Sequence, residues 1–187
     1  AALPSLQERF STPSGGVVTP GARAAVQTSR YRRVGVMATE ATVESESYVH
    51  AIRGFDAGAE VHQQACPGLA EFIQGGDVAS REVADAVRAY TTPLKEKRPD
   101  VVIMGCTHYP LIAPLLQRNL GRDVTLVNPA AEVAREVEEI LERQGLARRD
   151  EREGSYRFFC TGDPEAFRAV GARFLQMPLE DVTHVPL

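Results

Sequence analysis

The sequence has no tryptophan, few aromatic residues and only three cysteines among its 187 residues. Three cysteines far apart in the chain do not form a disulfide framework, so we expect a reducing compartment, the cytoplasm. No apolar run approaches the length of a transmembrane helix, and the first residues lack the order of a signal peptide. We therefore expect no membrane association. The net charge of −4 argues against direct binding of nucleic acid.

The sequence alternates strand and helix patterns throughout, and this alternation predicts an α/β fold with parallel sheets flanked by helices. A hydrophobic fraction of 43% is enough for a sizeable core. Thr19-Pro20-Gly21 and Asn128-Pro129 are the best candidates for hinges. The expected strands are 33–39, 60–65, 101–104, 124–127, 155–160 and 182–185. The expected helices are 43–55, a short one through 72–73, 78–94, one from 110, 130–144 and 164–175, and residues 1–10 resemble the middle of another.

The most informative segment is Val101–Pro110. Four apolar residues between Asp100 and Gly105 predict a fully buried parallel strand, and Pro110 suits the first turn of a helix. Cys106 lies between the two elements. Unpaired N–H groups and a helix dipole there favour thiolate over thiol, and the same N–H groups can bind a carboxylate. The alternative is a buried cysteine that packs as a small hydrophobe.

Three further polar residues are candidates for the same site. His108 either assists the Cys106 thiol or closes the turn with a hydrogen bond. Thr39 and Thr42 follow the strand that begins at Arg33, on the side of the sheet where open α/β folds bind ligands. Thr42 alternatively serves only as a helix N-cap.

The other two cysteines are expected to be structural. His62 and Cys66 have a spacing that suits a metal, but no third or fourth ligand joins them, so we expect no metal site. Cys160 ends an apolar strand and is interpreted as a core residue.

Six segments resemble the glutamate racemase family, in the family's order and over nearly the whole chain. The most specific is GCTHYPLI (105–112), and the others are VVTPGARAAV (17–26), VGVMATEATVES (34–45), ACP (65–67), VTLVNPAAEVAREV (124–137) and FFCTGDPEAF (158–167). The resemblance implies racemisation of L-glutamate to D-glutamate without a cofactor, for peptidoglycan synthesis. It implies two similar α/β domains with the substrate in the cleft between them. It also implies two catalytic cysteines on opposite faces of the α-carbon.

By this resemblance Cys106 is one catalytic cysteine, and Thr107 and His108 lie beside the substrate. Residues 20–127 would form the second domain, and residues 1–19 and 128–187 the remaining part of the first. The other cysteine, in a Cys-Asn-Thr motif, would precede Ala1, so we expect that upstream residues are missing from the given chain. Because members are often dimeric, we expect a homodimer, and because some bind DNA gyrase, a gyrase interaction is a further implication.

The sequence departs from the family at one position near the site. Gln74 stands where many members carry a glutamate thought to help one of the bases. Glu71 is the nearest acid and is an alternative for that role.

Three other functions stay open. An aspartate or hydantoin racemase of the same superfamily would use the same cysteine. A truncated, non-catalytic binding module is the alternative from another class, because the first cysteine is absent. A cysteine hydrolase ranks last, since no second glycine and no His–Asp pair accompany the strand–Gly–Cys–helix pattern.

Overall fold

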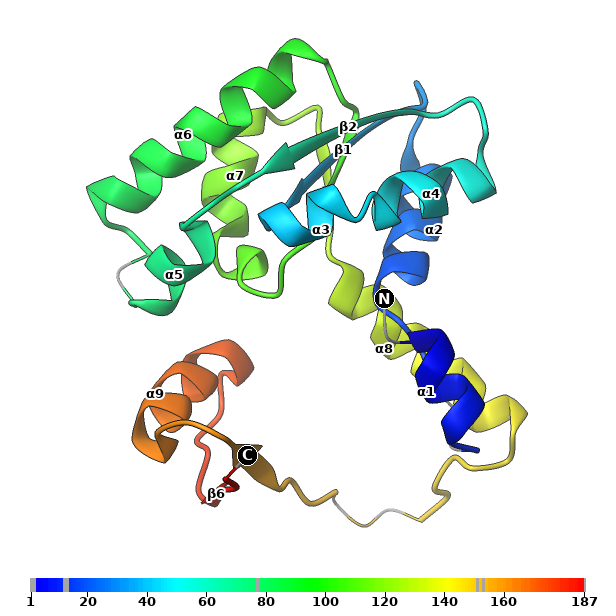
Figure 1. Ribbon diagram of the computed structural model, residues 1–187, viewed down its shortest axis with the longest axis vertical. Coiled ribbons are helices and arrows are strands. Elements are labelled where there is room, and N and C mark those ends of the chain that lie inside the picture. The colour runs from blue at the N-terminus through cyan, green and yellow to red at the C-terminus, as the bar shows by residue number, and fades with distance from the viewer. Residues whose placement is uncertain (1–2, 12–13, 77, 151, 153, 187) are drawn as a thin grey trace. The chain divides into compact units, whose positions relative to one another are not determined.

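The computed structural model describes residues 3–11, 14–76, 78–150, 152 and 154–186 (Figure 1). It divides into two compact units, Ala1–Ala147 and Arg148–Leu187. This division falls later in the chain than the expected boundary between residues 127 and 128. The assignment of 20–127 to one domain and of 1–19 with 128–187 to another stays a prediction about the complete family fold.

The larger unit is built around a four-stranded parallel sheet with the order β2-β1-β3-β4. Its strands are β1 (Arg33–Ala38), β2 (Glu60–Ala65), β3 (Val101–Met104) and β4 (Thr125–Val127). Its helices are α1 (Leu3–Arg9), α2 (Val18–Thr28), α3 (Glu40–Glu44), α4 (Ser47–Phe55), α5 (Leu69–Gln74), α6 (Arg81–Glu96), the 3₁₀ turn η1 (Tyr109–Ile112), α7 (Ala113–Leu120) and α8 (Pro129–Arg143).

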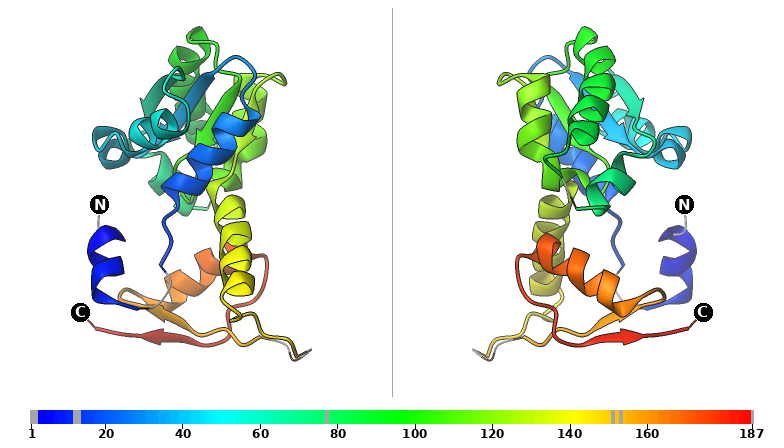
Figure 2. Two further views of the ribbon diagram at one scale, coloured as in Figure 1. Left: turned by 90° about the vertical axis from the view of Figure 1, so that its right-hand side faces the viewer. Right: turned by 90° about the vertical axis from the view of Figure 1, so that its left-hand side faces the viewer.

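Helices cover both faces of this sheet, which explains why β3 is apolar along its whole length and β1 is buried from Val34 to Ala38. Alternate residues of each strand enter two separate cores. Met37 and Val102 pack with α5, α6 and α7, whereas Val36 and Ile103 pack with α2 and α4. In Figure 2 the blue helix α2 lies in front of the sheet in one view, and the green helix α6 lies in front of it in the other. The predicted α/β fold with a parallel sheet is confirmed.

The smaller unit contains β5 (Phe158–Cys160), α9 (Pro164–Leu175) and β6 (Val182–His184). The two strands are parallel neighbours, and α9 connects them. Asp163 caps α9 as expected, because its carboxylate accepts hydrogen bonds from the backbone N–H groups of Glu165 and Ala166.

Three local predictions were wrong. Thr19-Pro20-Gly21 is not a hinge but lies in the first turn of α2, where the missing N–H of a proline is tolerated. The expected helix 43–55 is two helices, separated where Glu46 adopts the left-handed conformation with φ 49°. The helix expected from Pro110 begins as the 3₁₀ turn η1, and α7 follows only from Ala113.

Candidate active site

The candidate site lies at the carboxyl edge of the sheet, where the two central strands end. Met37 pairs with Met104 in register, so Thr39 after β1 and Cys106 after β3 follow neighbouring strands. Gly105 makes this approach possible. A Cβ atom at Gly105 would lie 3.0 Å from the carbonyl oxygen of Met37 and 3.1 Å from the Cβ of Ala38.

Cys106 is partly buried and contacts His108. Its Sγ atom lies 3.7 Å from Nδ1 of the imidazole. The intervening backbone turns sharply, because the N–H of Tyr109 donates to the carbonyl oxygen of Cys106 at 3.2 Å. A cysteine and a histidine two residues apart are therefore brought into contact by this turn, which the spacing alone left open.

The thiol of Cys106 is less acidic than expected. Burial raises its pKa, and the negative charge of Glu71 acts in the same direction. The backbone N–H groups of His108 and Tyr109 and the side chain of Thr107 lower the pKa, but they do not outweigh burial. The N–H effect expected to favour thiolate is therefore present, but burial outweighs it. The N–H groups act with the expected sign, but η1 is a single short turn, so no long helix directs its dipole at the sulfur.

His108 is also in contact with Gln74. The Nε2 atom of the imidazole lies 3.3 Å from Oε1 of the Gln74 side chain, at the end of α5. Gln74, rather than Glu71, therefore occupies the position next to the histidine. Glu71, one turn earlier, acts on Cys106 through its charge.

Thr39 and Thr42 form a pair. Their hydroxyl oxygens are 3.0 Å apart, and both side chains are partly buried. Thr39, and not Thr42, is the residue that precedes the first turn of α3, and its side chain makes no capping hydrogen bond. The N-cap interpretation of Thr42 was wrong, because α3 begins at Glu40.

The buried thiol of Cys66 and the side chains of Tyr90 and Tyr109 lie behind the candidate site. The sequence patterns did not predict this arrangement. Burial raises the pKa of Cys66 to about 12, and its thiol donates to the carbonyl oxygen of Gln64 at 3.5 Å. The hydroxyl of Tyr109 is buried and makes no hydrogen bond within the described part of the chain, and Tyr90 donates to the carbonyl oxygen of Pro67 at 2.6 Å. Cys66 is thus a core residue behind the site, in agreement with its structural interpretation. Cys160 is also buried.

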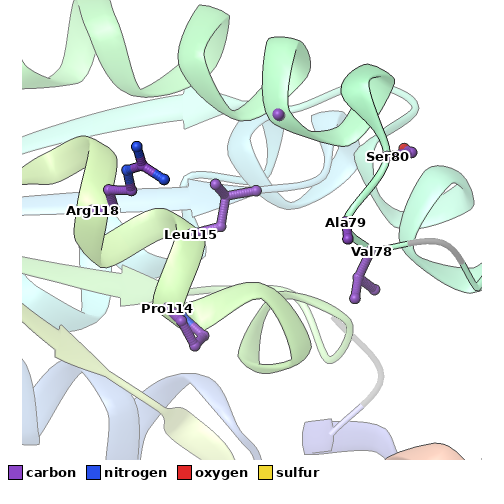
Figure 3. A pocket seen from close by; sticks show the side chains of 7 residues that line it. Val78, Ala79, Ser80, Pro114, Leu115 and Arg118 are labelled. Carbon is purple, nitrogen blue, oxygen red and sulfur yellow. The ribbon is translucent and has the colours of Figure 1, made fainter.

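A separate hollow of about 420 Å³ lies where the chain enters α6 and passes α7. Figure 3 shows Pro114, Leu115 and Arg118 on α7, opposite Val78 and Ser80. Cys106 does not line it. This hollow and the candidate site are therefore different places on the larger unit.

The structure also bears on metals and membranes. Among the described residues, no three His, Cys, Asp or Glu side chains are grouped so as to hold a metal ion. Within the same part of the chain, no helix has the length and apolar character needed to cross a membrane.

Comparison with known proteins confirms the resemblance. A family model described as Asp/Glu/Hydantoin racemase matches residues 1–137. A glutamate racemase of Listeria monocytogenes is 36% identical over 187 residues, which are 100% of this chain and 70% of that protein. Glutamate racemase isoform RacE1 from Bacillus anthracis has a TM-score of 0.94 and 36% identity, with 100% of this chain and 70% of that chain covered. Glutamate racemase from Francisella tularensis, solved in complex with D-glutamate, has a TM-score of 0.88 and 28% identity. The match covers 96% of this chain and 66% of that chain. The chain therefore belongs to the Asp/Glu/Hydantoin racemase family.

Proposed function

We propose that this chain carries one half of the catalytic machinery of a glutamate racemase, which interconverts L-glutamate and D-glutamate without a cofactor. The observation that carries the proposal is the contact between Cys106 and His108 at the carboxyl edge of the sheet. The relatives that match the whole chain are named glutamate racemases, and one of the matching structures contains D-glutamate.

The proposed reaction moves one proton on each face of the α-carbon. In one direction the thiolate of Cys106 takes the α-proton, and the electron pair of the broken C–H bond stays on the substrate as a carbanion. A second acid then delivers a proton to the opposite face. In the other direction the thiol of Cys106 gives its proton to the carbanion. A thiol suits both roles, because its ordinary pKa of about 8.5 is near the working pH.

Substrate binding is assigned to the polar groups around the sulfur. The backbone N–H groups of Thr107 to Tyr109 would hold the carboxylate as negative charge builds up in the transition state. The side chains of Thr107, His108, Thr39 and Thr42 would contact the substrate's charged groups. By the family resemblance, the second acid is a cysteine in a Cys-Asn-Thr motif. None of the three cysteines of the sequence is followed by Asn-Thr.

The biological setting is proposed from the same resemblance. The product D-glutamate would serve peptidoglycan synthesis in the cytoplasm of a bacterium, and the complete protein would form a homodimer. An interaction with DNA gyrase belongs to the same proposal. Size-exclusion chromatography with light scattering tests the dimer, and co-purification with gyrase tests the interaction.

The proposal is tested by replacing Cys106 in the complete protein. Cys106→Ser should lower kcat/KM for glutamate by about 10²–10⁴-fold, the usual contribution of one acid–base group. The same variant should lose incorporation of solvent deuterium at the α-carbon on one face. Cys160→Ser is the matched control, because Cys160 lies in the smaller unit. Racemisation by Cys106→Ser at the unmodified rate would refute the assignment.

A second candidate is an aspartate or hydantoin racemase, because the matching family model includes both. The same cysteine would act on a different substrate. Turnover of the enantiomers of glutamate, aspartate and a hydantoin by the complete protein decides between them, and we expect glutamate to give the highest kcat/KM.

A further inference from the structure

Three groups form a continuous polar chain on the larger unit. Sγ of Cys106 lies 3.7 Å from Nδ1 of His108, and Nε2 of the same ring lies 3.3 Å from Oε1 of Gln74. The two ring nitrogens thus face different partners. A neutral imidazole carries a proton on only one ring nitrogen. Whether Gln74 favours a proton on Nε2 therefore determines whether Nδ1 accepts a hydrogen bond from the thiol or donates one to it.

The chemistry of an amide oxygen restricts this arrangement. An amide oxygen only accepts hydrogen bonds, so the ring nitrogen that faces it carries the proton. A neutral imidazole with its proton on Nε2 has a lone pair on Nδ1, and this lone pair points to the thiol. The thiol then donates its hydrogen to Nδ1, and both partners are neutral.

An amide also stabilises an imidazolium less than a carboxylate does, because hydrogen bonds to an ionised acceptor are roughly twice as strong. A neutral partner at position 74 therefore favours transfer of the Cys106 proton to His108 less than a carboxylate would. We propose that Gln74 is a positioning residue for Cys106: its side-chain oxygen fixes His108 with the proton on Nε2, and this keeps the sulfur in its protonated, proton-donating form at neutral pH.

Ionisable groups near the site, within the part of the chain that the structure describes, agree with this assignment. They include Glu71 on α5, Cys66 after β2, Tyr109 in η1, Tyr90 on α6, and Glu40 on α3, which acts on Tyr90. Burial raises the pKa of both Cys66 and Tyr109, so these two stay neutral near pH 7. The charge of Glu71 also disfavours the thiolate of Cys106. None of these groups supplies a positive charge that would draw the proton from the sulfur.

The sign of one substitution tests the proposal. In Gln74→Glu, a carboxylate next to Nε2 favours the imidazolium, and the imidazolium favours the thiolate of Cys106. The pH midpoint of Cys106 alkylation by iodoacetamide should fall by about one unit, a modest shift for an opposite charge at this range. Rates are measured by mass spectrometry of the Cys106 peptide. A midpoint that is unchanged or higher would overturn the proposal.

Measuring Gln74→Glu in a chain that lacks the histidine separates the effect carried through His108 from direct charge repulsion between position 74 and the sulfur. In His108→Ala, the carboxylate of Gln74→Glu can act on the sulfur only through space, as Glu71 does, so the midpoint should rise. Glu71→Gln in the unaltered background calibrates the size of that through-space effect and should lower the midpoint. If Gln74→Glu lowers the midpoint equally with and without His108, the proposed path through the histidine is wrong.

The unaltered chain gives an independent measurement that needs no variant. Nitrogen-15 NMR at pH 8 should show His108 with a protonated Nε2 and an unprotonated Nδ1. A proton on Nδ1 would overturn the proposal. The relevance of this device to catalysis rests on the proposed function, but neither readout needs racemisation. If Cys106→Ser retained racemase activity, the proposed function of Cys106 would be refuted, but the tautomer assigned to His108 would not be affected.

Discussion

The glycine between β3 and Cys106 offers the sharpest test of how the sheet positions the sulfur. In Gly105→Ala, the new Cβ would lie 3.0 Å from the Met37 carbonyl oxygen and 3.1 Å from both Ala38 Cβ and a ring carbon of Tyr48. Ordinary contacts of this kind are 3.5–4.0 Å. Two of the three neighbours belong to β1, an interior strand, so relief requires a shift of the backbone.

Overfilling a close-packed site of this kind costs about 1–3 kcal/mol, so Gly105→Ala should lower the free energy of unfolding by about 2 kcal/mol. Urea unfolding followed by circular dichroism measures this value. Gly54→Ala is the matched control. Gly54 lies within α4, and no atom is within 4 Å of a Cβ at this position. This second change should raise the free energy of unfolding by about 0.5 kcal/mol, because alanine favours the helix.

The two variants make the same chemical change, one hydrogen replaced by one methyl group, and are expected to differ in sign. If Gly105→Ala proves as stable as Gly54→Ala, the approach of β3 to β1 at this point is not tight. The argument that glycine is required before Cys106 would then fail.

Three further outcomes are expected. Asp100 is partly desolvated, but hydrogen bonds from Tyr31 N–H, Ser29 Oγ and Arg30 N–H outweigh this and lower its pKa below 3.8. Its folded pKa is below its unfolded value, so it stabilises the fold above about pH 4. Asp100→Asn should therefore cost about 1 kcal/mol at pH 7, and urea titrations should show this cost disappearing as the pH falls towards 2. At pH 8, iodoacetamide should modify Cys106 well before the buried Cys66, and equal rates in the peptide map would contradict the site geometry. Thr39→Val in the complete protein should raise KM for glutamate several-fold with little change in unfolding free energy, whereas an unchanged KM would remove this hydroxyl from the substrate site.

Periodicity predicted the elements whose burial is uniform. The four apolar residues Val101–Met104 form β3 with both faces covered, as expected. Periodicity failed where a tertiary contact decides the backbone. Pro20 and Gly21 indicated a turn, but both are buried in α2, and a Cβ on Gly21 would lie 3.1 Å from the ring of Pro129. Close packing against α8, which no local pattern records, explains that glycine.

The position of the candidate site in the fold was predictable, but its electrostatics were not. The pattern around Cys106 placed the sulfur and His108 directly after a buried strand, as the structure has them, because a strand end followed by a tight turn is encoded locally. The acidity of the thiol was not predictable, since it depends on how deeply the sulfur is buried and on Glu71, which lies 35 positions earlier in the sequence. The contact of His108 with Gln74 likewise joins residues 34 positions apart.

Cys106 and Gln74 are held by very different parts of the larger unit. Cys106 follows an interior strand whose four residues are all buried, whereas Gln74 is the exposed last residue of a six-residue helix. A substitution at position 74 can therefore change the surroundings of His108 without disturbing the packed interior that holds Cys106. Under the proposed role of Gln74, the proton affinity of the sulfur can be altered from the surface of the molecule.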